Sequence, residues 1–299
     1  MDAVTVQLAV STDLTALAEL VGRGGVVVLS GAGISTESGI PDYRGETGRA
    51  RNVTPMTFQA FVADPQARQR YWARSFVGFR IMSAAAPNDG HRAIADLQAR
   101  GLLDGIVTQN VDGLHQAAGA RDVVELHGAL DRVACLHCGH ISARSELDER
   151  LREANPDFVA WAAQVNPDGD AALPADVVSR FRTVDCRSCR GPLKPDVVFF
   201  GESVPRERVQ DCFALVESAS ALLVLGSSLS VMSGRRFVLR AAKLGIPVAI
   251  VNHGPTRADG HAAVRLDAPL GPTLRALVCA LPDGLPRSGI PVRPSSAAL

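Results

Sequence analysis

The sequence lacks any apolar run that approaches the roughly 18–20 residues needed to span a bilayer. Its apolar runs, such as residues 26–29 and 221–225, have the length of buried strands. Basic residues are also missing from the N-terminal end, where the first is Arg23. A secretory signal or a transit peptide requires an early basic residue, so the sequence predicts neither. We therefore expect a cytoplasmic protein that does not associate with membranes and whose thiols stay reduced.

The sequence also lacks an excess of charge of one sign. Lys plus Arg and Asp plus Glu each total 31, so the formal net charge is zero. This balance gives no support for a general nucleic-acid-binding protein, and we expect no direct binding to nucleic acid. With 299 residues, of which 46% are hydrophobic, the chain is long and apolar enough to bury a substantial core.

Short apolar runs alternate with helical patterns along most of the chain. The strand-like runs span residues 26–29, 105–108, 123–126, 197–200, 222–226 and 246–251, and helical patterns span residues 12–22, 91–100, 206–218 and 234–244. The first run is continuously apolar, as in a strand that is buried on both faces. Alternating strands and helices predict an α/β fold with a parallel sheet covered by helices on both faces.

The stretch from residue 131 to 193 interrupts this alternation. It contains four of the six cysteines and a polar, acidic middle. We interpret it as a small inserted module, which would split a larger domain into residues 1–130 and 194–284. The remaining residues, 285–299, contain several prolines and predict a disordered tail.

Two C-x-x-C pairs lie within this stretch, Cys135/Cys138 and Cys186/Cys189. Four thiolates are the ligand set of a structural tetrahedral zinc ion, and a set with no open position argues against catalytic zinc. The intervening residues 139–185 exceed the usual spacing of roughly 15–20 residues, so the spacing alone only suggests a metal site. Disulfide bonds are the alternative, which a reducing compartment disfavours.

A glycine-rich segment follows the first predicted strand. Residues 29–39 read LSGAGISTESG, and glycines there let backbone N–H groups approach a phosphate at a helix start. The ordinary dinucleotide fingerprint has a third glycine where Thr36 stands, and an acidic residue about 20 positions further on. Residues 49–60 contain no acidic residue. The segment therefore favours a nucleotide phosphate but not a simple hydride-transferring dehydrogenase, and a tight turn without a ligand is the alternative.

Several short motifs occur in one characteristic order between about residues 20 and 270. They are GAGIS (31–35), GIPDYR (39–44), TQNVDGLH (108–115), ELHG (125–128), the two C-x-x-C pairs, KPDVVFFGE (194–202), GSSL (226–229) and VN (251–252). In this order they resemble the motifs of the sirtuins, the NAD-dependent protein lysine deacylases. YWAR (71–74), NPDGD (166–170) and Tyr43 are most similar to the class that includes the mitochondrial sirtuin-4 type.

The resemblance implies a Rossmann-like NAD-binding domain with an inserted zinc-binding module. It also implies NAD as co-substrate, one structural zinc ion, and acylated-lysine proteins as partners. The acyl-lysine oxygen would attack C1′ of the nicotinamide ribose, nicotinamide would leave, and the acyl group would end on ADP-ribose. The protein would contribute mainly positioning and electrostatic stabilisation.

The resemblance gives catalytic roles to three residues. His127 would be the general base that takes a proton from a ribose hydroxyl, which suits a side chain with an ordinary pKa of about 6.5. Asn110 and Asp112 would lie at the nicotinamide and its ribose. His91 and His115 lack such a context, and we interpret them as surface or structural residues.

The resemblance also implies binding residues at the ends of the predicted strands. Those for NAD are Gly31, Ala32, Gly33, Ser35, Asp42, Tyr43, Arg44, Gln109, Asn110, Asp112, Gly226, Ser227, Ser228 and Asn252. The run at residues 197–201 would accept the substrate peptide as an added strand, with Val197, Val198, Phe199 and Gly201 in contact. A buried core strand is a compatible reading for half of these side chains.

Tyr71 and Arg74 are three residues apart, so they would share one face of a helix. Sirtuins that remove acidic acyl groups carry a Y-x-x-R in the corresponding region, where Arg pairs with the distal carboxylate. We therefore predict that the chain accepts at least one bulky or carboxylated acyl group, and a solvated helix face is the alternative. The insertion at about residues 142–182 either reaches into the acyl channel or only decorates the module.

Two other functions are compatible with parts of this pattern. A mono-ADP-ribosyltransferase would capture the same C1′ intermediate with another nucleophile, and it would use the same residues. A non-catalytic NAD sensor would need no general base, so the presence of His127 with Asn110 and Asp112 disfavours it.

Overall fold

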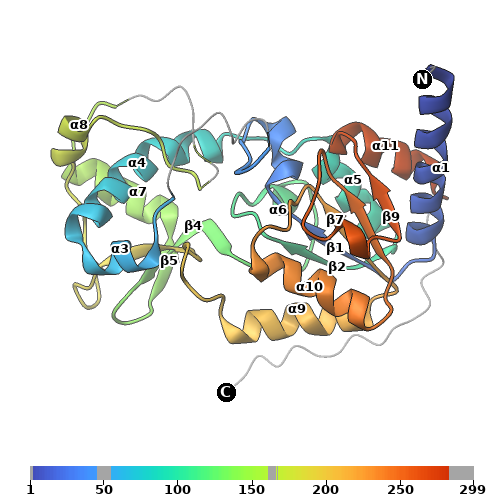
Figure 1. Cartoon of the computed structure of the whole chain (residues 1–299). Helices are drawn as coiled ribbons and strands as arrows, with labels where there is room; N and C mark the ends of the chain where they lie inside the picture. Colours follow the sequence, from blue (N-terminus) through green and yellow to red (C-terminus); the bar gives the residue numbers. More distant parts are fainter. Residues whose placement is uncertain (1–2, 46–54, 161–165, 167, 283–299) are drawn as a thin grey trace.

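The computed structural model describes residues 3–45, 55–160, 166 and 168–282. This part of the chain forms a larger α/β body, which contains both the first and the last helix, and a smaller body beside it (Figure 1). The tail predicted at residues 285–299 lies outside the described residues. Within the described ranges, no helix combines the length and the apolar character that a membrane crossing requires.

A six-stranded parallel sheet forms the centre of the larger body. Its strands are β1 (Val26–Ser30), β2 (Leu103–Thr108), β3 (Val123–Glu125), β7 (Ala221–Leu225), β8 (Val248–Val251) and β9 (Val264–Leu266), in the order β3-β2-β1-β7-β8-β9. Every neighbouring pair is parallel. The central strand β1 is buried along its whole length, which explains its continuous apolar sequence. The predicted α/β fold with a parallel sheet is confirmed.

Helices cover both faces of this sheet (Figure 1). One face packs against α1 (Ala3–Gly22), α5 (Asp89–Ala99) and α11 (Leu270–Ala280), and the other packs against α9 (Arg206–Ser218) and α10 (Met232–Lys243). Alternate side chains of β1 divide between the two layers, with Val26 and Val28 in the first core and Val27 and Leu29 in the second. This division is that of a doubly wound sheet, as the sequence predicts.

Two predicted elements differ from the observed ones, and one strand of the six-stranded sheet was not predicted. The helix predicted at residues 12–22 is longer, because α1 begins at Ala3, and the short strand β9 has no predicted counterpart. The strand predicted at residues 197–200 is wrong, because β6 (Leu193–Val197) ends where that strand was to begin. An apolar run does not by itself distinguish a strand from an extended segment whose side chains pack into a core.

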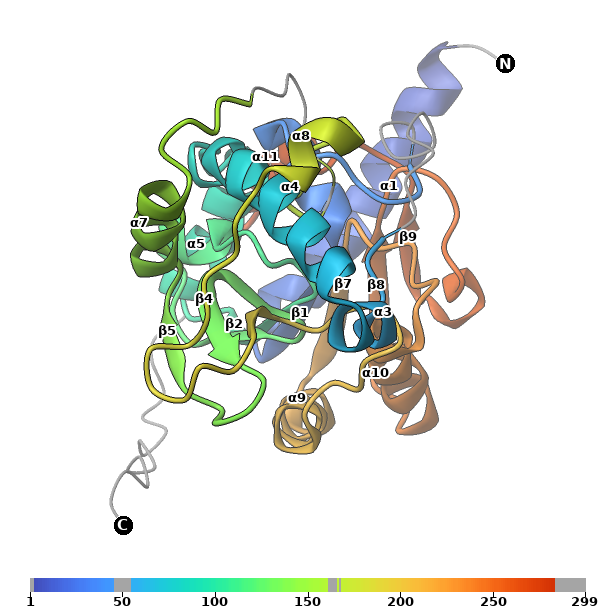
Figure 2. The same ribbon diagram turned by 90° about the vertical axis from the view of Figure 1, so that its left-hand side faces the viewer.

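The smaller body combines an antiparallel sheet with helices from two parts of the chain. Its strands are β4 (Gly128–Cys135), β5 (Ile141–Ala143) and β6, in the order β5-β4-β6, and its helices include α3 (Phe58–Ala63), α4 (Pro65–Ser83), α7 (Arg144–Ala154) and α8 (Ala175–Ser179). Phe61 and Trp72, from α3 and α4, share one core with Val133 of β4. Figure 2 shows α3 and α4 in front of the main sheet. The packed body therefore includes helices that precede the predicted module at residues 131–193, and the domain boundaries stay a prediction.

A buried cation joins α7 to α4. Arg144 is fully buried, and its Nε lies 2.7 Å from Asp148 Oδ1. The two terminal nitrogens donate to the hydroxyl and the carbonyl oxygen of Ser75 at 3.0 and 3.1 Å. The guanidinium also lies over the ring of Phe79, 4.5 Å from its centroid. Because a buried charge is stable only with such partners, this cluster fixes how the two helices pack.

Replacing Arg144 with Met should lower the free energy of unfolding by roughly 3 kcal/mol, because Asp148 would keep a partly buried charge without its partner. Urea unfolding followed by circular dichroism measures this loss. Arg152→Met, at an exposed position of the same helix, is the matched control and should change the value by less than about 0.5 kcal/mol. Equal losses in the two variants would contradict the assigned role of Arg144.

Candidate active site

A cavity of about 890 Å³ lies at the carboxyl ends of the parallel strands. Residues that follow β1, β2, β7 and β8 line part of it, as expected where loops leave the carboxyl edge of a doubly wound sheet. His127, which lies between β3 and β4, and residues 197–201 of the smaller body line another part. Every NAD-binding residue predicted from the sequence lies in the wall of this cavity.

Glycines hold the loops after β1 and β7 in direct backbone contact. A Cβ on Gly33 would lie 2.8 Å from the Cα of Gly226, and the Gly33 N–H donates to the Gly226 carbonyl at 2.8 Å. Gly226 itself has a φ of 61°, in the left-handed region that favours glycine. The loop after β1 then continues as a short 3₁₀ helix, η1 (Ala32–Ser38). The glycines therefore allow the two loops to come into direct contact.

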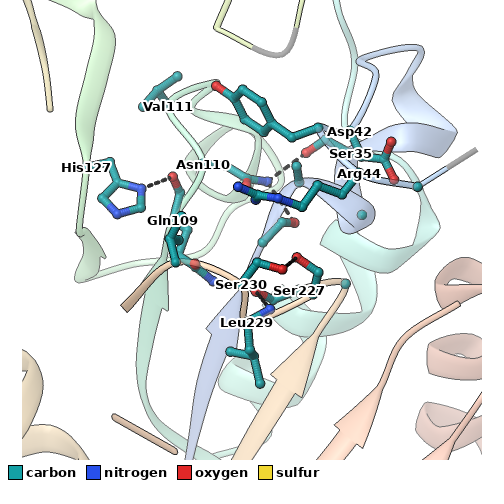
Figure 3. A pocket seen from close by; sticks show the side chains of 18 of the residues that line it. Ser35, Asp42, Arg44, Gln109, Asn110, Val111, His127, Ser227, Leu229 and Ser230 are labelled. Atoms are coloured by element: carbon teal, nitrogen blue, oxygen red, sulfur yellow. Dashed lines mark hydrogen bonds between the residues drawn. The ribbon is translucent and has the colours of Figure 1, made fainter. Parts of the chain in front are cut away.

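Polar side chains from these loops form a connected network (Figure 3). Asn110 Nδ2 donates to Ser35 Oγ at 3.0 Å, and Ser35 Oγ donates to Asp112 Oδ2 at 2.7 Å. Gln109 Nε2 donates to Ser227 Oγ at 2.9 Å. The network fixes the orientation of side chains that the sequence predicts only to be near one another.

Both ring nitrogens of His127 have partners. Nδ1 lies 2.8 Å from the carbonyl oxygen of Gln109, and because a carbonyl only accepts, Nδ1 carries the proton in this contact (Figure 3). Nε2 lies 2.9 Å from Ser233 Oγ, so it accepts from that hydroxyl when the ring is neutral. Burial lowers the pKa of His127 from its ordinary value of 6.5, and the bond to the Gln109 carbonyl partly opposes this shift. The ring is thus a neutral base whose lone pair lies on Nε2.

Ser233 is a contact that the sequence analysis missed. It lies in the first turn of α10, and its only sequence signal is that it follows the GSSL motif. Its hydroxyl shows that Nε2 of His127 can accept a hydrogen bond from an alcohol within the cavity.

His91 and His115 lie behind the polar network and are buried, which supports the structural interpretation over the surface one. His115 Nε2 lies 2.8 Å from Ser30 Oγ, and His91 Nε2 lies 3.4 Å from Ser35 Oγ. Burial lowers the pKa of each histidine to about 4, so both rings are neutral at physiological pH. Their ring nitrogens contact the hydroxyl groups of Ser30, at the end of β1, and of Ser35, and they add no charge to the site.

The predicted peptide-binding residues Val197, Val198, Phe199 and Gly201 all line the cavity. The Val198 N–H donates to the carbonyl of His127 at 2.8 Å, which fixes this segment against the candidate base. Phe199 turns into the core of the smaller body, and Phe200 packs edge-on against Tyr43 with a centroid distance of 5.9 Å. The segment is therefore an irregular edge between the two bodies rather than a strand.

Tyr71 and Arg74 do not occur among the described residues that line the cavity. Tyr71 is buried between aromatic rings of the smaller body, 5.4 Å from the ring centroid of Phe61. Arg74 Nε lies 3.1 Å from the carboxylate of Asp170, so its partner in the structure is a residue of the insertion. The pairing of Arg74 with an acyl carboxylate stays a prediction.

The four cysteines of the two C-x-x-C pairs meet in the smaller body. The Sγ atoms of Cys135, Cys138, Cys186 and Cys189 all lie within 4.8 Å of one another. Zinc–thiolate bonds of about 2.3 Å place tetrahedral sulfurs roughly 3.8 Å apart, so these distances fit one zinc ion. Backbone N–H groups of His137 and Gly191 point at two of the sulfurs, each at 3.4 Å. The cluster does not line the cavity, which agrees with a structural role for the metal.

Replacing Cys186 with Ser should remove the zinc ion and lower the unfolding temperature, because three thiolates hold zinc far less tightly than four. Elemental analysis of the purified protein measures the metal content. Cys279→Ser, at an exposed cysteine outside the cluster, is the matched control and should keep one zinc ion per chain. Full zinc content in Cys186→Ser would contradict the assigned ligand set.

Comparison with known proteins places the chain among relatives of one kind. The Sir2 family model matches residues 31–233. The chain is 61% identical over 264 residues to NAD-dependent protein deacetylase 1 of Streptomyces coelicolor, with 88% of each chain covered. It is 50% identical over 268 residues to the NAD-dependent protein deacetylase of Bordetella bronchiseptica, with 89% of this chain and 98% of the relative covered.

Solved structures agree with the sequence comparison. A Sir2 structure with a p53 peptide and NAD⁺ matches with a TM-score of 0.69 and 30% identity, covering 87% of this chain and 94% of that one. A second Sir2 enzyme structure matches with a TM-score of 0.71 and 32% identity, covering 90% and 97%. The motifs, the fold and the relatives agree, and the chain belongs to the Sir2 family, the sirtuins.

Proposed function

We propose that this protein is an NAD-dependent protein lysine deacetylase or deacylase. It would transfer the acyl group of a modified lysine to ADP-ribose with release of nicotinamide. One observation carries the proposal: a neutral histidine, His127, lies where the loops of the parallel sheet meet the edge segment at residues 197–201. A base between a dinucleotide site and a peptide site is the arrangement that this reaction requires.

The residues present fit a dinucleotide. Hydroxyl and amide groups of Ser227, Ser228 and Asn252 line the cavity and suit ribose and phosphate oxygens, and Arg44 offers a cation for the pyrophosphate. Bound there, NAD supplies an electrophilic C1′ and a leaving group. Asn110 and Asp112 would face the nicotinamide end, where an amide can orient a carboxamide or a water molecule without adding positive charge.

His127 is suited to remove a proton from a ribose hydroxyl. Its Nδ1–H donates a hydrogen bond to the Gln109 carbonyl, so Nε2 is the ring nitrogen that can accept a proton. The lowered pKa keeps Nε2 unprotonated near neutral pH. The contact with Ser233 places an alcohol at Nε2 already, at 2.9 Å. A ribose hydroxyl in the same position would be within reach of the base.

Acylated-lysine proteins are the substrates that this geometry suits. A peptide would lie along residues 197–201 and bind mainly through backbone hydrogen bonds, which demand little of the peptide sequence. One of the matching Sir2 structures contains a p53 peptide and NAD⁺, and another contains an acetylated peptide. A cytoplasmic location and the absence of nucleic-acid binding remain expectations from the sequence.

The direct test is product analysis by mass spectrometry after incubation with NAD and an acetyl-lysine peptide. We expect deacetylated peptide, free nicotinamide and O-acetyl-ADP-ribose in equal amounts. ADP-ribose retained on a protein, without deacetylated peptide, would favour mono-ADP-ribosyltransfer instead. An absence of free nicotinamide would contradict both activities.

His127→Ala should reduce the turnover of an acetyl-lysine peptide by about 10²- to 10⁴-fold, the usual contribution of a positioned general base. NAD binding, measured by calorimetry, should change little, because the ring takes a proton rather than holding the dinucleotide. His261→Ala is the matched control, since His261 is exposed and outside the cavity. Near-normal turnover in His127→Ala would show that another group acts as the base.

A further inference from the structure

The segment formed by the described residues 166 and 168–171 belongs to the long insertion of the smaller body and is fixed on α4. Arg74 Nε donates to the Ala171 carbonyl at 2.8 Å, and the Ala171 N–H donates to the Arg74 carbonyl at 3.2 Å. The same guanidinium pairs with the carboxylate of Asp170 at 3.1 Å. Within the segment, the Asn166 N–H donates to the Asp170 carbonyl at 2.8 Å. These contacts hold the segment against α4.

Two glycines let this segment approach α4 and the cavity wall. A Cβ on Gly78 of α4 would overlap the carbonyl oxygen of Gly169, so the helix accepts the segment only with glycine there. Gly169 has a φ of 77°, and a Cβ on it would lie 2.6 Å from Leu130 Cδ1 and 3.3 Å from Met82 Cγ. The backbone of the segment therefore rests directly on side chains of the smaller body.

The consequence is that Asp168 lines the cavity. Its Oδ1 atom is buried, and none of the described residues donates a hydrogen bond to it. Burial and the neighbouring Asp170 carboxylate raise the pKa of Asp168 to about 7. The charge of Arg74 is already balanced by Asp170, so it does not compensate a second carboxylate.

The Asp170 carboxylate lies beside Asp168, and the charge of Asp168 adds to the effect of burial in raising the pKa values of Tyr43 and Tyr71. The other nearby side chains of the cavity wall are apolar. Met82, which touches the backbone beside Asp168, lines the cavity together with Val111 and Val197. These three side chains pack in one hydrophobic cluster with Leu130. A carboxyl group that has one oxygen without a described donor and lies beside this apolar part of the wall suits a site that recognises one polar group of a ligand.

We propose that Asp168 selects the acyl group. It accepts a hydrogen bond from an uncharged donor near the end of the acyl chain, such as an amide or a hydroxyl, and it excludes chains that end in a carboxylate. This inference rests on the proposed deacylase function, because it takes the apolar part of the cavity as the place of the acyl chain.

The physical reason is the state of the Asp168 oxygen. A buried acceptor without a partner is costly, and a donor on the acyl chain removes that cost. A second carboxylate would add a like charge in a poorly solvated place where the nearest guanidinium is already paired with Asp170. The expected preference is therefore opposite to the pairing of Arg74 with an acyl carboxylate that the sequence suggested, and it is compatible with a bulky acyl group.

The test uses three peptides of one sequence that differ only at the modified lysine, which carries an acetyl, a succinyl or a succinamoyl group. Succinyl and succinamoyl have the same shape, but one ends in a carboxylate and the other in an amide. At pH 8, where Asp168 is mostly ionised, the wild-type protein should show a kcat/KM about tenfold or more higher for succinamoyl than for succinyl. Asp168→Asn, which keeps the volume, should reduce that ratio by about tenfold.

Asp157→Asn, at an exposed aspartate of the same body, is the matched control and should keep the wild-type ratio. The proposal is overturned if the wild type prefers succinyl, if Asp168→Asn leaves the ratio unchanged, or if neither protein acts on either long chain. The acetyl peptide distinguishes a failure of the acyl selection by Asp168 from a failure of the deacylase function. A wild-type protein that is inactive on the acetyl peptide would refute the deacylase function itself. If Asp168→Asn also loses activity on the acetyl peptide, the variant is uninformative, and the wild-type ratio of kcat/KM for succinamoyl over succinyl then supports or overturns the proposal.

Discussion

The contact between the His127 ring and the carbonyl of Gln109 connects the chemistry of the site to the parallel sheet. Gln109 follows β2, and its own N–H donates to the carbonyl of Ser30 at the end of β1 at 3.0 Å. The orientation of the base is therefore set by the alignment of the two central strands. On its other side, the carbonyl of His127 accepts from Val198, so the same residue also fixes the edge of the smaller body. A chain of backbone contacts thus fixes His127 between the loops of the parallel sheet and the edge segment at residues 197–201.

The smaller body is stabilised away from the cavity that it helps to form. The four-cysteine cluster connects the C-x-x-C pair at the end of β4 to the C-x-x-C pair that precedes β6. The buried Arg144 joins α7 to α4. Neither feature lines the cavity. The insertion brings Asp168 from this body into the cavity wall.

The sequence predicted the location of a residue correctly where that residue directly follows the end of a strand. Gly31, Gln109, Ser227 and Asn252 each follow a buried apolar run, and a parallel sheet brings the carboxyl ends of such runs to one edge. It failed where contacts join segments that have no common pattern. The bond from Ser233 to His127 and the fit of the insertion against Gly78 depend on packing between distant segments. The strand predicted at residues 197–200 failed for a related reason, because the apolar Phe199 is buried in a core and not in a sheet.

The tautomer and charge of His127 are the quantities on which the account depends most. Proton–nitrogen correlation spectra of protein with ¹⁵N-labelled histidine report both directly, and comparison with His127→Gln assigns the signal. At pH 7 we expect a neutral ring that carries its proton on Nδ1, because the Gln109 carbonyl accepts a hydrogen bond from Nδ1–H and burial lowers the pKa of the ring. A ring protonated on Nε2, or one that is positively charged at pH 7, would contradict it.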